Sequence, residues 1–449
     1  MSFPPHVAPR VPRPRGLALV AALVRNSLEV LPAAVYREDF VATPGTRAPR
    51  AWVTSPALIK SVLLDQRDKF RKLTQIRLLG PLLGRGILTS EDADWRWQRQ
   101  AAAPIFRPQD LAAFVPAFVQ CAERAVERWR GGGGAVRSMD EDITRLTLEI
   151  VAQTLLPGGD EAFMGTLQDS VRRMQRSGGW DILYASMDVP RWVPRPGRRR
   201  GRVEARIMRE AVARRLRAHR AQPPRDDDLV ARLVAARDPE TGRAMDEQQL
   251  VDNLLTFYLA GHETTAKAIA WTLYLLARSP EWSGALVEEI ESVTGGAPVR
   301  AGHLDRLERV QQVLKESMRL FPPVPMMSRQ AVAGTTLGAH AIAAGTSVLI
   351  PIYAIHRHAA RWERPHEFDP ARFAPQLERA IPRYQYMPFG AGPRICIGMP
   401  FAMMEATAVI ATLLQHATFS WAGREEPEPV ARVTLAPRGG MPMRVGVRA

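Results

Sequence analysis

Residues 388–398 read Pro-Phe-Gly-Ala-Gly-Pro-Arg-Ile-Cys-Ile-Gly, and an apolar run with helical periodicity follows from Pro400 to Leu414. The pattern predicts a glycine-rich loop that places Cys396 at the start of a helix. The N-terminus of a helix carries unpaired N–H groups and partial positive charge, and both favour the thiolate form of a cysteine. The glycines let the backbone approach a flat ligand closely, and Arg394 offers a cation to an acidic group on it. We therefore expect Cys396 to be an anionic ligand.

The rest of the chain predicts a large, mainly helical protein. Of 449 residues, 46% are hydrophobic, which excludes a disordered or fibrous chain. Short β-type runs appear at residues 51–53 and near residues 346–352. We predict a mainly α fold with small peripheral β-sheets. Apolar residues recur at helical spacing in Leu111–Trp129, Ile143–Leu156 and Val203–His219.

The domain organisation is predicted from breakers and linkers. Residues 1–33 form a Pro/Arg-rich lead with a short helix, and residues 34–449 form a single domain, because no long polar linker divides them. The run Arg195–Arg202 contains proline and glycine and is not expected inside a helix. The longest apolar run near the start, Gly16–Val24, is shorter than the roughly 20 residues of a membrane-spanning helix. We expect no membrane anchor and no secretory signal.

The charge balance is strongly basic. Lys plus Arg total 61 against 46 acidic residues, a net charge of +15, and only five of the 61 are lysine. This surplus suits an acidic partner, anionic lipid or nucleic acid, but the arginine-rich codon usage of a GC-rich bacterial genome explains it equally well. We expect no nucleic-acid partner. The two cysteines, Cys121 and Cys396, exclude a disulfide framework and favour a reducing, cytoplasmic location.

Two histidine patterns do not predict metal sites. His262-Glu263 begins like H-E-x-x-H, but Ala266 occupies the second histidine position. Three further histidines, at positions 356, 358 and 366, lie in a Pro-rich polar stretch without a ligand set of metal spacing. We expect them to be exposed.

The cysteine loop resembles the signature F-x-x-G-x-R-x-C-x-G of the cytochrome P-450 family of haem-thiolate enzymes. All five fixed positions match: Phe389, Gly392, Arg394, Cys396 and Gly398. The resemblance implies the P-450 fold and a haem b cofactor (iron protoporphyrin IX). It further implies that Cys396 is the proximal iron ligand, that Phe389 packs beside its sulfur and that Arg394 pairs with a haem propionate.

Other segments resemble the supporting motifs of the family. Glu316 and Arg319 are spaced for one helix face and, with Arg372 of Phe368-Asp-Pro-Ala-Arg-Phe373, resemble its structural triad.

The pattern W-x-x-x-R at residues 95–99 resembles a further family helix, in which Trp95 and Arg99 reach a propionate. Cation–π stacking of these two side chains without a cofactor is the alternative. Arg329 resembles another propionate contact.

A second long helix carries polar residues within an apolar run. Asp246 is expected to cap it, and the helix is expected to reach about Arg278, before Pro280. Its segment Ala260-Gly261-His262-Glu263-Thr264-Thr265 resembles the family motif A/G-G-x-D/E-T. By this resemblance Ala260 and Gly261 leave room for O2 beside the haem, and Glu263 and Thr264 relay protons as catalytic residues. The alternative is that Thr264 bonds only to a carbonyl of its own helix.

The resemblance implies a monooxygenase that uses O2 as co-substrate. We expect no reductase module, so that electrons come from a separate acidic ferredoxin or flavodoxin, for which Arg96, Arg107 and Arg383 are candidate docking residues. The expected substrate is a lipophilic small molecule, with a fatty acid or terpenoid favoured; Arg71, Lys72 and Arg77 could hold a carboxylate. We expect the segment 175–201 to cover the entrance. Expected pocket residues are Leu88, Leu255, Ala260, Val324, Met326 and Met327.

Two other functions stay open at this point. A haem-thiolate enzyme could use peroxide or isomerise an oxygenated lipid without external electrons. Alternatively, the protein could be a basic binding protein for nucleic acid or anionic lipid.

Overall fold

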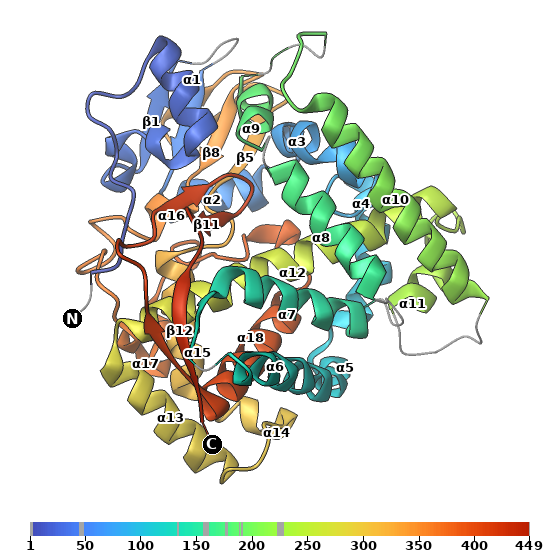
Figure 1. Ribbon diagram of the computed structural model, residues 1–449. Helices are drawn as coiled ribbons and strands as arrows, with labels where there is room; N and C mark the ends of the chain where they lie inside the picture. The colour runs from blue at the N-terminus through green and yellow to red at the C-terminus, as the bar shows by residue number, and fades with distance from the viewer. Residues whose placement is uncertain are drawn as a thin grey trace.

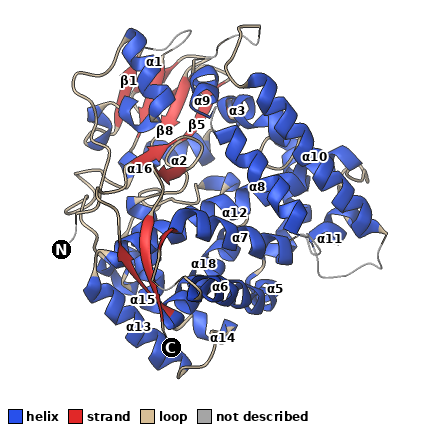
Figure 2. Cartoon of the chain, viewed as in Figure 1, coloured by secondary structure: helices blue, strands red, loops and turns tan. Residues whose placement is uncertain are grey.

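The computed structural model describes residues 3–44, 49–132, 134–155, 161–175, 178–187, 189, 192–221 and 229–448. Helices make up most of the chain, and the largest group of strands gathers at one side (Figures 1 and 2). The predicted mainly α fold with small sheets is therefore confirmed.

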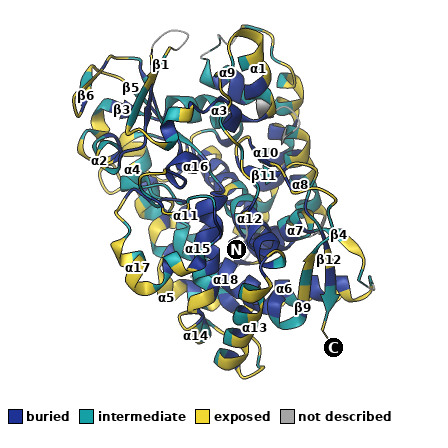
Figure 3. Ribbon diagram, turned by 90° about the vertical axis from the view of Figure 1, so that its left-hand side faces the viewer, coloured by how far each residue is buried: buried dark blue, intermediate teal, exposed yellow. Residues whose placement is uncertain are grey.

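One long helix, α12 (Glu247–Ala277), runs through the middle of the molecule (Figure 1). Its N-terminus is capped as predicted, because the Asp246 carboxylate accepts a hydrogen bond from the Gln249 N–H at 2.7 Å. Pro280 then begins the next helix, α13 (Pro280–Thr294). The helices packed against α12 include α7 (Met139–Thr154), α10 (Arg198–Arg220), α15 (Glu308–Leu320) and α18 (Met399–His416). Figure 3 shows α12, α15 and α18 as largely buried.

The remaining helices surround this core. They are α1 (Gly16–Arg25), α2 (Pro56–Lys60), α3 (Leu73–Leu83), α4 (Asp92–Ala102), α5 (Pro108–Leu111), α6 (Val115–Arg130), α8 (Glu161–Gln175), α9 (Gly178–Ser186), α11 (Leu229–Ala235), α14 (Ala301–Leu304), α16 (Ile352–Ile355) and α17 (Pro375–Ala380). The two amphipathic runs 111–129 and 203–219 thus form helices as predicted. The predicted end of a third helix, at Leu156, lies outside the described residues.

The strands form one five-stranded sheet and three smaller groups. The large sheet has the order β1 (Phe40–Thr43), β2 (Arg50–Val53), β8 (Ser347–Ile350), β5 (Met327–Ala331), β3 (Phe70–Arg71), and only β2 and β8 pair in parallel within it. A second sheet joins β4 (Val136–Ser138), β12 (Pro442–Val447) and β9 (Ala417–Trp421). Two hairpins complete the set, β6 (Thr335–Leu337) with β7 (His340–Ile342), and β10 (Pro429–Ala431) with β11 (Leu435–Pro437).

Two local predictions are wrong. Helix α10 begins at Arg198, so most of the run 195–202 is helical; Gly197, with a φ of 79°, makes the turn that precedes it. His356 and His358 are buried rather than exposed, because α16 and the following turn carry them into the interior. Proline and polar neighbours therefore did not indicate exposure here.

The N-terminal lead contacts the rest of the protein at several points. Helix α1, the short helix predicted for the lead, packs against α9 through Ala22, Leu23 and Leu183. Beyond α1, the Asn26 amide donates to the Pro429 carbonyl at 2.9 Å and accepts from the Ala431 N–H at 3.0 Å. None of the helices in the described ranges combines the length and apolar character that crossing a membrane requires.

Candidate functional site

The loop before α18 holds Cys396 by its own backbone. The Cys396 N–H donates to the Phe389 carbonyl at 3.0 Å, which places the sulfur at the N-terminus of α18. The Phe389 side chain is half-buried. Gly392 has a φ of 72°, and a Cβ there would lie 2.7 Å from the Leu63 carbonyl oxygen. Glycine at 392 thus lets the loop pack on residues 61–65, and the expected approach to a flat ligand is not its reason.

Gly398 differs from Gly392 because a Cβ atom at this position would fit without a clash. A Cβ at 398 would lie 3.8 Å from Phe106 and 3.9 Å from the Cys396 sulfur, which are ordinary contact distances. The chain itself therefore has no steric need for glycine at this position.

The Cys396 sulfur faces an enclosed space. The side chain is exposed, yet burial by the surrounding protein is the largest influence on its pKa. Burial raises the pKa of the Cys396 thiol, although the N–H groups of Gly398 and Met399 and the charge of Arg99 act to lower it. The N–H groups at the start of α18 thus favour the thiolate, as expected, but in the chain by itself burial outweighs them. A bound metal ion deprotonates a coordinating thiol outright.

Trp95 and two arginines lie beside this loop. The Arg394 guanidinium stacks on the Trp95 ring at 3.9 Å, and Arg99 lies farther from the same ring, at 5.9 Å. Arg99 donates to the Ile395 carbonyl at 2.8 Å. The structure thus brings together Trp95, Arg99 and Arg394. The contact of Arg99 with Trp95, which the sequence left as an alternative, is present but long, and Arg394 stacks more closely on the same ring.

More buried cations gather around Arg394, and we call Lys72, Arg329, Arg394 and Glu91 the cationic cluster. Arg394 pairs with Glu91 at 2.8 Å, and Lys72 Nζ donates to the Leu88 carbonyl at 2.6 Å. Burial lowers the pKa of Arg329 to about 10. Burial, together with the charges of Arg394 and Arg329, lowers the pKa of Lys72 to about 7. Lys72 therefore belongs to this cluster; the sequence had grouped it with Arg71 and Arg77.

The cationic cluster fits the acidic edge of a haem. Three cationic side chains gather around the carboxylate of Glu91, with Asp92 as a smaller influence on Arg394 among the described residues, and buried charges are normally paired. Within the described residues Arg329, 9% exposed, makes one hydrogen bond, to the Ser328 carbonyl at 2.8 Å. Two propionates would supply the missing negative charge. A thiol at the wall of an enclosed space and unbalanced cations beside it are a donor set that suits an iron porphyrin.

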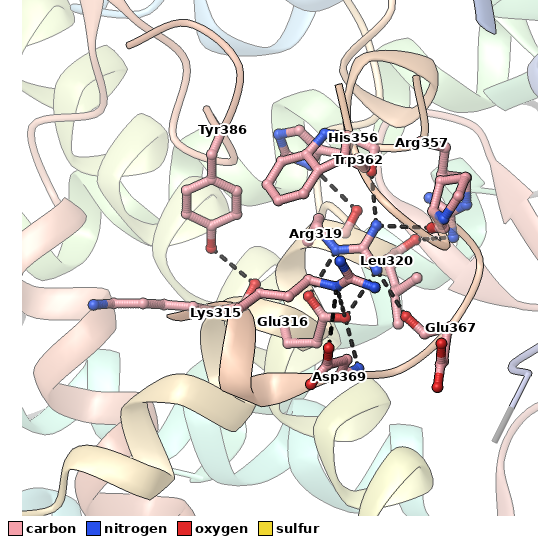
Figure 4. Close-up of polar contacts among 12 residues, drawn as sticks. Lys315, Glu316, Arg319, Leu320, His356, Arg357, Trp362, Glu367, Asp369 and Tyr386 are labelled. Atoms are coloured by element: carbon pink, nitrogen blue, oxygen red, sulfur yellow. Dashed lines mark hydrogen bonds and ion pairs between the residues drawn. The ribbon is translucent and has the colours of Figure 1, made fainter. Parts of the chain in front are cut away.

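The predicted structural triad is also brought together, and we call Glu316, Arg319 and Arg372 the ion-pair cluster. Figure 4 shows Glu316 and Arg319. Glu316 and Arg319 have side chains that are 0% exposed and form a bidentate pair at 2.6 and 2.8 Å. Arg372 lies 3.6 Å from Glu316. Arg319 also donates to the backbone carbonyls of residues 356, 365 and 367 at 2.8 to 2.9 Å, so all five of its N–H groups are bonded.

A histidine connects the ion-pair cluster to the cysteine loop, and Figure 4 shows this residue, His356, beside Arg319. His356 Nδ1 lies 3.2 Å from the Arg319 carbonyl, and its Nε2 accepts the Met387 N–H at 3.0 Å. Burial and the neighbouring arginines lower the pKa of His356 to about 3, so the ring is neutral. Met387 begins the turn that leads to Cys396, since its carbonyl accepts the Gly390 N–H. Sequence reasoning missed this connection.

The predicted oxygen-side residues lie on α12, but their side chains point in different directions. The Thr264 hydroxyl donates to the Ala260 carbonyl of its own helix at 2.7 Å. The Glu263 carboxylate accepts the Thr434 hydroxyl at 2.7 Å. A Cβ on Gly261 would lie 3.2 Å from Val151 of α7, so this glycine allows close helix packing rather than opening space for O2. Ala260 is the exposed position of the segment.

A buried carboxyl group near this segment was missed by sequence reasoning. Glu405 on α18 is fully buried, lies beside Thr265, and burial raises the pKa of its carboxyl well above the usual range. Within the described residues neither oxygen has a partner of good hydrogen-bond geometry. Its position in an apolar run gave no signal of this.

The expected pocket residues differ in how far their side chains are exposed. Leu88 and Ala260 are exposed, and Val324, Met326 and Met327 are half-buried. Leu255 is 0% exposed and packs in the main core, so its assignment to the pocket is wrong. It lies on a different face of α12 from Ala260. Part of the segment 175–201, predicted to cover the entrance, lies outside the described residues.

Comparisons with known proteins agree with these features. A family model described as Cytochrome P450 matches residues 40–441. Cyclooctat-9-en-7-ol 5-monooxygenase of Streptomyces melanosporofaciens is 32% identical over 85% of this chain and 80% of that protein. Cytokinin hydroxylase of Arabidopsis thaliana is 31% identical over 90% of this chain and 80% of its own length. The structure is similar to the crystal structure of the cytochrome P450DA heme domain, with a TM-score of 0.81, 24% identity, and coverage of 92% and 90% of the two chains.

Proposed function

This chain belongs to the cytochrome P450 family and is a haem-thiolate monooxygenase, and from that premise we propose that it oxidises a lipophilic fatty acid or terpenoid. When bound, the haem iron activates O2 with two electrons and two protons, so that one oxygen atom enters the substrate and the other leaves as water. The observation that carries the proposal is the enclosed Cys396 sulfur beside the cationic cluster.

The chain's own residues would hold the haem from two sides. Cys396 would bind the iron, with its backbone fixed by Phe389 and its sulfur beside Gly398. Trp95, Arg99, Arg329 and Arg394 would hold the propionates, and Lys72 is added to them here. We propose haem b as the cofactor, because the residues that face the site offer one thiol and no second cysteine.

On α12, Glu263 and Thr264 would control protons at the O2 side. The Thr264 hydroxyl donates to the Ala260 carbonyl, which leaves the lone pairs of its oxygen free to accept a proton donor. Glu263 is a carboxylate one residue away and would exchange protons with solvent. We propose that the two work through intervening water, since their side chains point apart.

The substrate proposal depends on the apolar surface near these residues. Apolar side-chain atoms are presented by Leu88, Val324, Met326 and Met327. The small, exposed side chain of Ala260 leaves space beside α12. One relative is named for the oxidation of cyclooctat-9-en-7-ol, which favours a terpenoid for this chain. A substrate-induced spin-state shift, measured by absorbance across fatty-acid and terpenoid panels, tests this. The proposal is wrong if neither panel gives a shift in haem-loaded protein.

Electrons are proposed to come from a separate acidic ferredoxin or flavodoxin in the cytoplasm. Arg96, Arg107 and Arg383 are exposed, as docking requires. Product formation with ferredoxin, reductase and NADPH should fall as ionic strength rises. Turnover with peroxide alone, and none with the electron-transfer proteins, would favour the alternative of a peroxide-driven or isomerising enzyme.

Two variants test the central assignments. Cys396→Ser should abolish the strongly red-shifted Soret band of the reduced carbonyl complex, and an unchanged band would remove Cys396 as the iron ligand.

Thr264→Ala should divert electrons from product to peroxide, which is measured as product formed per NADPH consumed. Undiminished coupling in this variant would show that protons take another route.

A further inference from the structure

The hairpin of β10 and β11 is anchored close to the oxygen-side segment of α12. Its strands pair Ala431 with Leu435 and leave a loop of residues 432–434. The Leu435 N–H donates to the Pro323 carbonyl at 2.9 Å, and the Trp271 indole of α12 donates to the Leu435 carbonyl at 3.1 Å. Trp271 is fully buried and stacks on Phe321. The loop is therefore fixed on its α12 side by buried bonds.

The last loop residue, Thr434, meets Glu263. Its hydroxyl donates to Glu263 Oε1 at 2.7 Å, and Thr434 is only 7% exposed. A hydroxyl that donates to a carboxylate makes a charge-assisted bond, which is stronger than a bond between neutral groups. The neighbouring Val433 is 44% exposed and has no polar side-chain atom. Thr434 is thus placed to act on the Glu263 carboxylate.

We infer that Thr434 is a positioning residue for Glu263, and this inference rests on the proposed function of Glu263 in proton transfer. A glutamate side chain loses considerable rotamer freedom when it is ordered, and a proton carrier must lie within hydrogen-bond reach of its target. The hydroxyl of Thr264 points to its own helix and does not orient Glu263. The hydrogen bond from Thr434 holds the carboxylate in one orientation, so the C-terminal hairpin helps to set proton delivery on α12.

The test compares Thr434→Val, which removes the hydroxyl at nearly constant volume, with Thr434→Ser, which keeps it. Val433→Ala is the control in the same loop. Each is made in the wild-type and the Glu263→Gln background. The readout is the rate of hydrogen-peroxide-driven guaiacol oxidation per haem, measured in H2O and in D2O. This assay needs neither the natural substrate nor the redox partner.

We expect Glu263→Gln to lower the rate about a hundredfold and to change the solvent isotope effect. Thr434→Val should lower the rate about three- to tenfold with the same change in isotope effect. Thr434→Ser and Val433→Ala should keep the wild-type isotope effect. In the Glu263→Gln background, Thr434→Val should add nothing, because its effect passes through the carboxylate.

Different results overturn different claims. A wild-type isotope effect in Thr434→Val, with a changed one in Glu263→Gln, would overturn the positioning inference alone. An equal loss from Thr434→Val in both backgrounds would do the same, since the hydroxyl would then act elsewhere. A wild-type rate and isotope effect in Glu263→Gln would overturn the proposed function of Glu263 together with the inference. If Thr434→Val does not fold, Thr434→Ala replaces it, with the same outcomes.

Discussion

The ion-pair cluster and the cationic cluster are both buried, but only one of them is complete without a ligand. In the ion-pair cluster, Glu316 and Arg319 are bonded to each other, and the remaining donors of Arg319 reach backbone carbonyls. In the cationic cluster, Lys72, Arg329 and Arg394 surround the carboxylate of Glu91, and among the described residues Asp92 adds a smaller influence on Arg394. A complete network stabilises the fold, whereas unbalanced charge destabilises it until a ligand arrives. This difference separates structural residues from cofactor-binding residues.

Breaking the ion-pair cluster should have the largest effect. Glu316→Ala leaves the Arg319 guanidinium buried without its counter-ion, and we expect the apoprotein to lose about 3–5 kcal/mol of unfolding free energy. Denaturant unfolding followed by circular dichroism measures this. The control is Lys315→Ala, which removes a partly exposed pair with Glu378 and should cost about 0.2–1 kcal/mol. Equal losses in the two variants would show that burial of the pair does not matter.

Removing a cation from the cationic cluster should weaken haem binding and leave the stability of the apoprotein intact. Arg329→Met removes a buried cation for which the described residues offer no direct ion pair, so the apoprotein should be as stable as the wild type or more stable. Haem should dissociate about 10–100-fold faster, because a supporting contact of the cofactor is lost. Transfer of haem to apomyoglobin, followed by absorbance, measures the rate. A large loss of apoprotein stability would place Arg329 in the fold instead.

Lys72 should make the stability of the apoprotein depend on pH. Its pKa is about 7 in the folded chain against 10.5 for the free side chain. Between these values the unfolded chain holds a proton that the folded chain lacks, so stability rises with pH, by at most about 1.4 kcal/mol per pH unit. As pH falls toward 7 this contribution is lost. The difference between wild type and Lys72→Met, measured by urea unfolding at pH 7 to 10, should show this slope, and a difference that is constant with pH would contradict it.

The smallest effect is expected at the edge of the ion-pair cluster. Arg372→Gln removes an ion pair of 3.6 Å, but Glu316 keeps its two bonds from Arg319 and accepts the Asp369 N–H at 2.9 Å. We expect a loss of about 1 kcal/mol, measured by the same denaturant unfolding. A loss as large as that of Glu316→Ala would mean that Arg372 is as central as Arg319.

The sequence predicted those features that depend on neighbours along the chain. The start of α12 followed from Asp246, and the position of Cys396 followed from the loop pattern. Leu255 was assigned wrongly because apolar character alone does not tell which face of a buried helix meets a pocket. Glu405 was missed for a similar reason, since burial of a carboxyl group depends on the helices packed around it.

Contacts between distant segments were not predictable from one sequence. Glu263 and Thr434 are separated by 171 positions, and no periodicity relates them. Lys72 and Arg394 meet at Glu91, whose carboxylate accepts the Lys72 N–H at 3.2 Å and pairs with Arg394 at 2.8 Å. Gly261 and Gly392 were read as space for ligands, whereas the structure uses both for close packing of the chain on itself.

The bonds between residues 26–27 and β10 have a practical consequence for anyone who shortens this protein. Asn26 and Ser27 together make three hydrogen bonds to Pro429 and Ala431, at 2.9 to 3.1 Å. A truncated version that starts at residue 34 would leave those backbone groups without partners, at the base of the loop that carries Thr434. Deletions intended for crystallisation should therefore stop before Asn26, and longer ones are expected to disturb turnover even though they remove no residue near the iron.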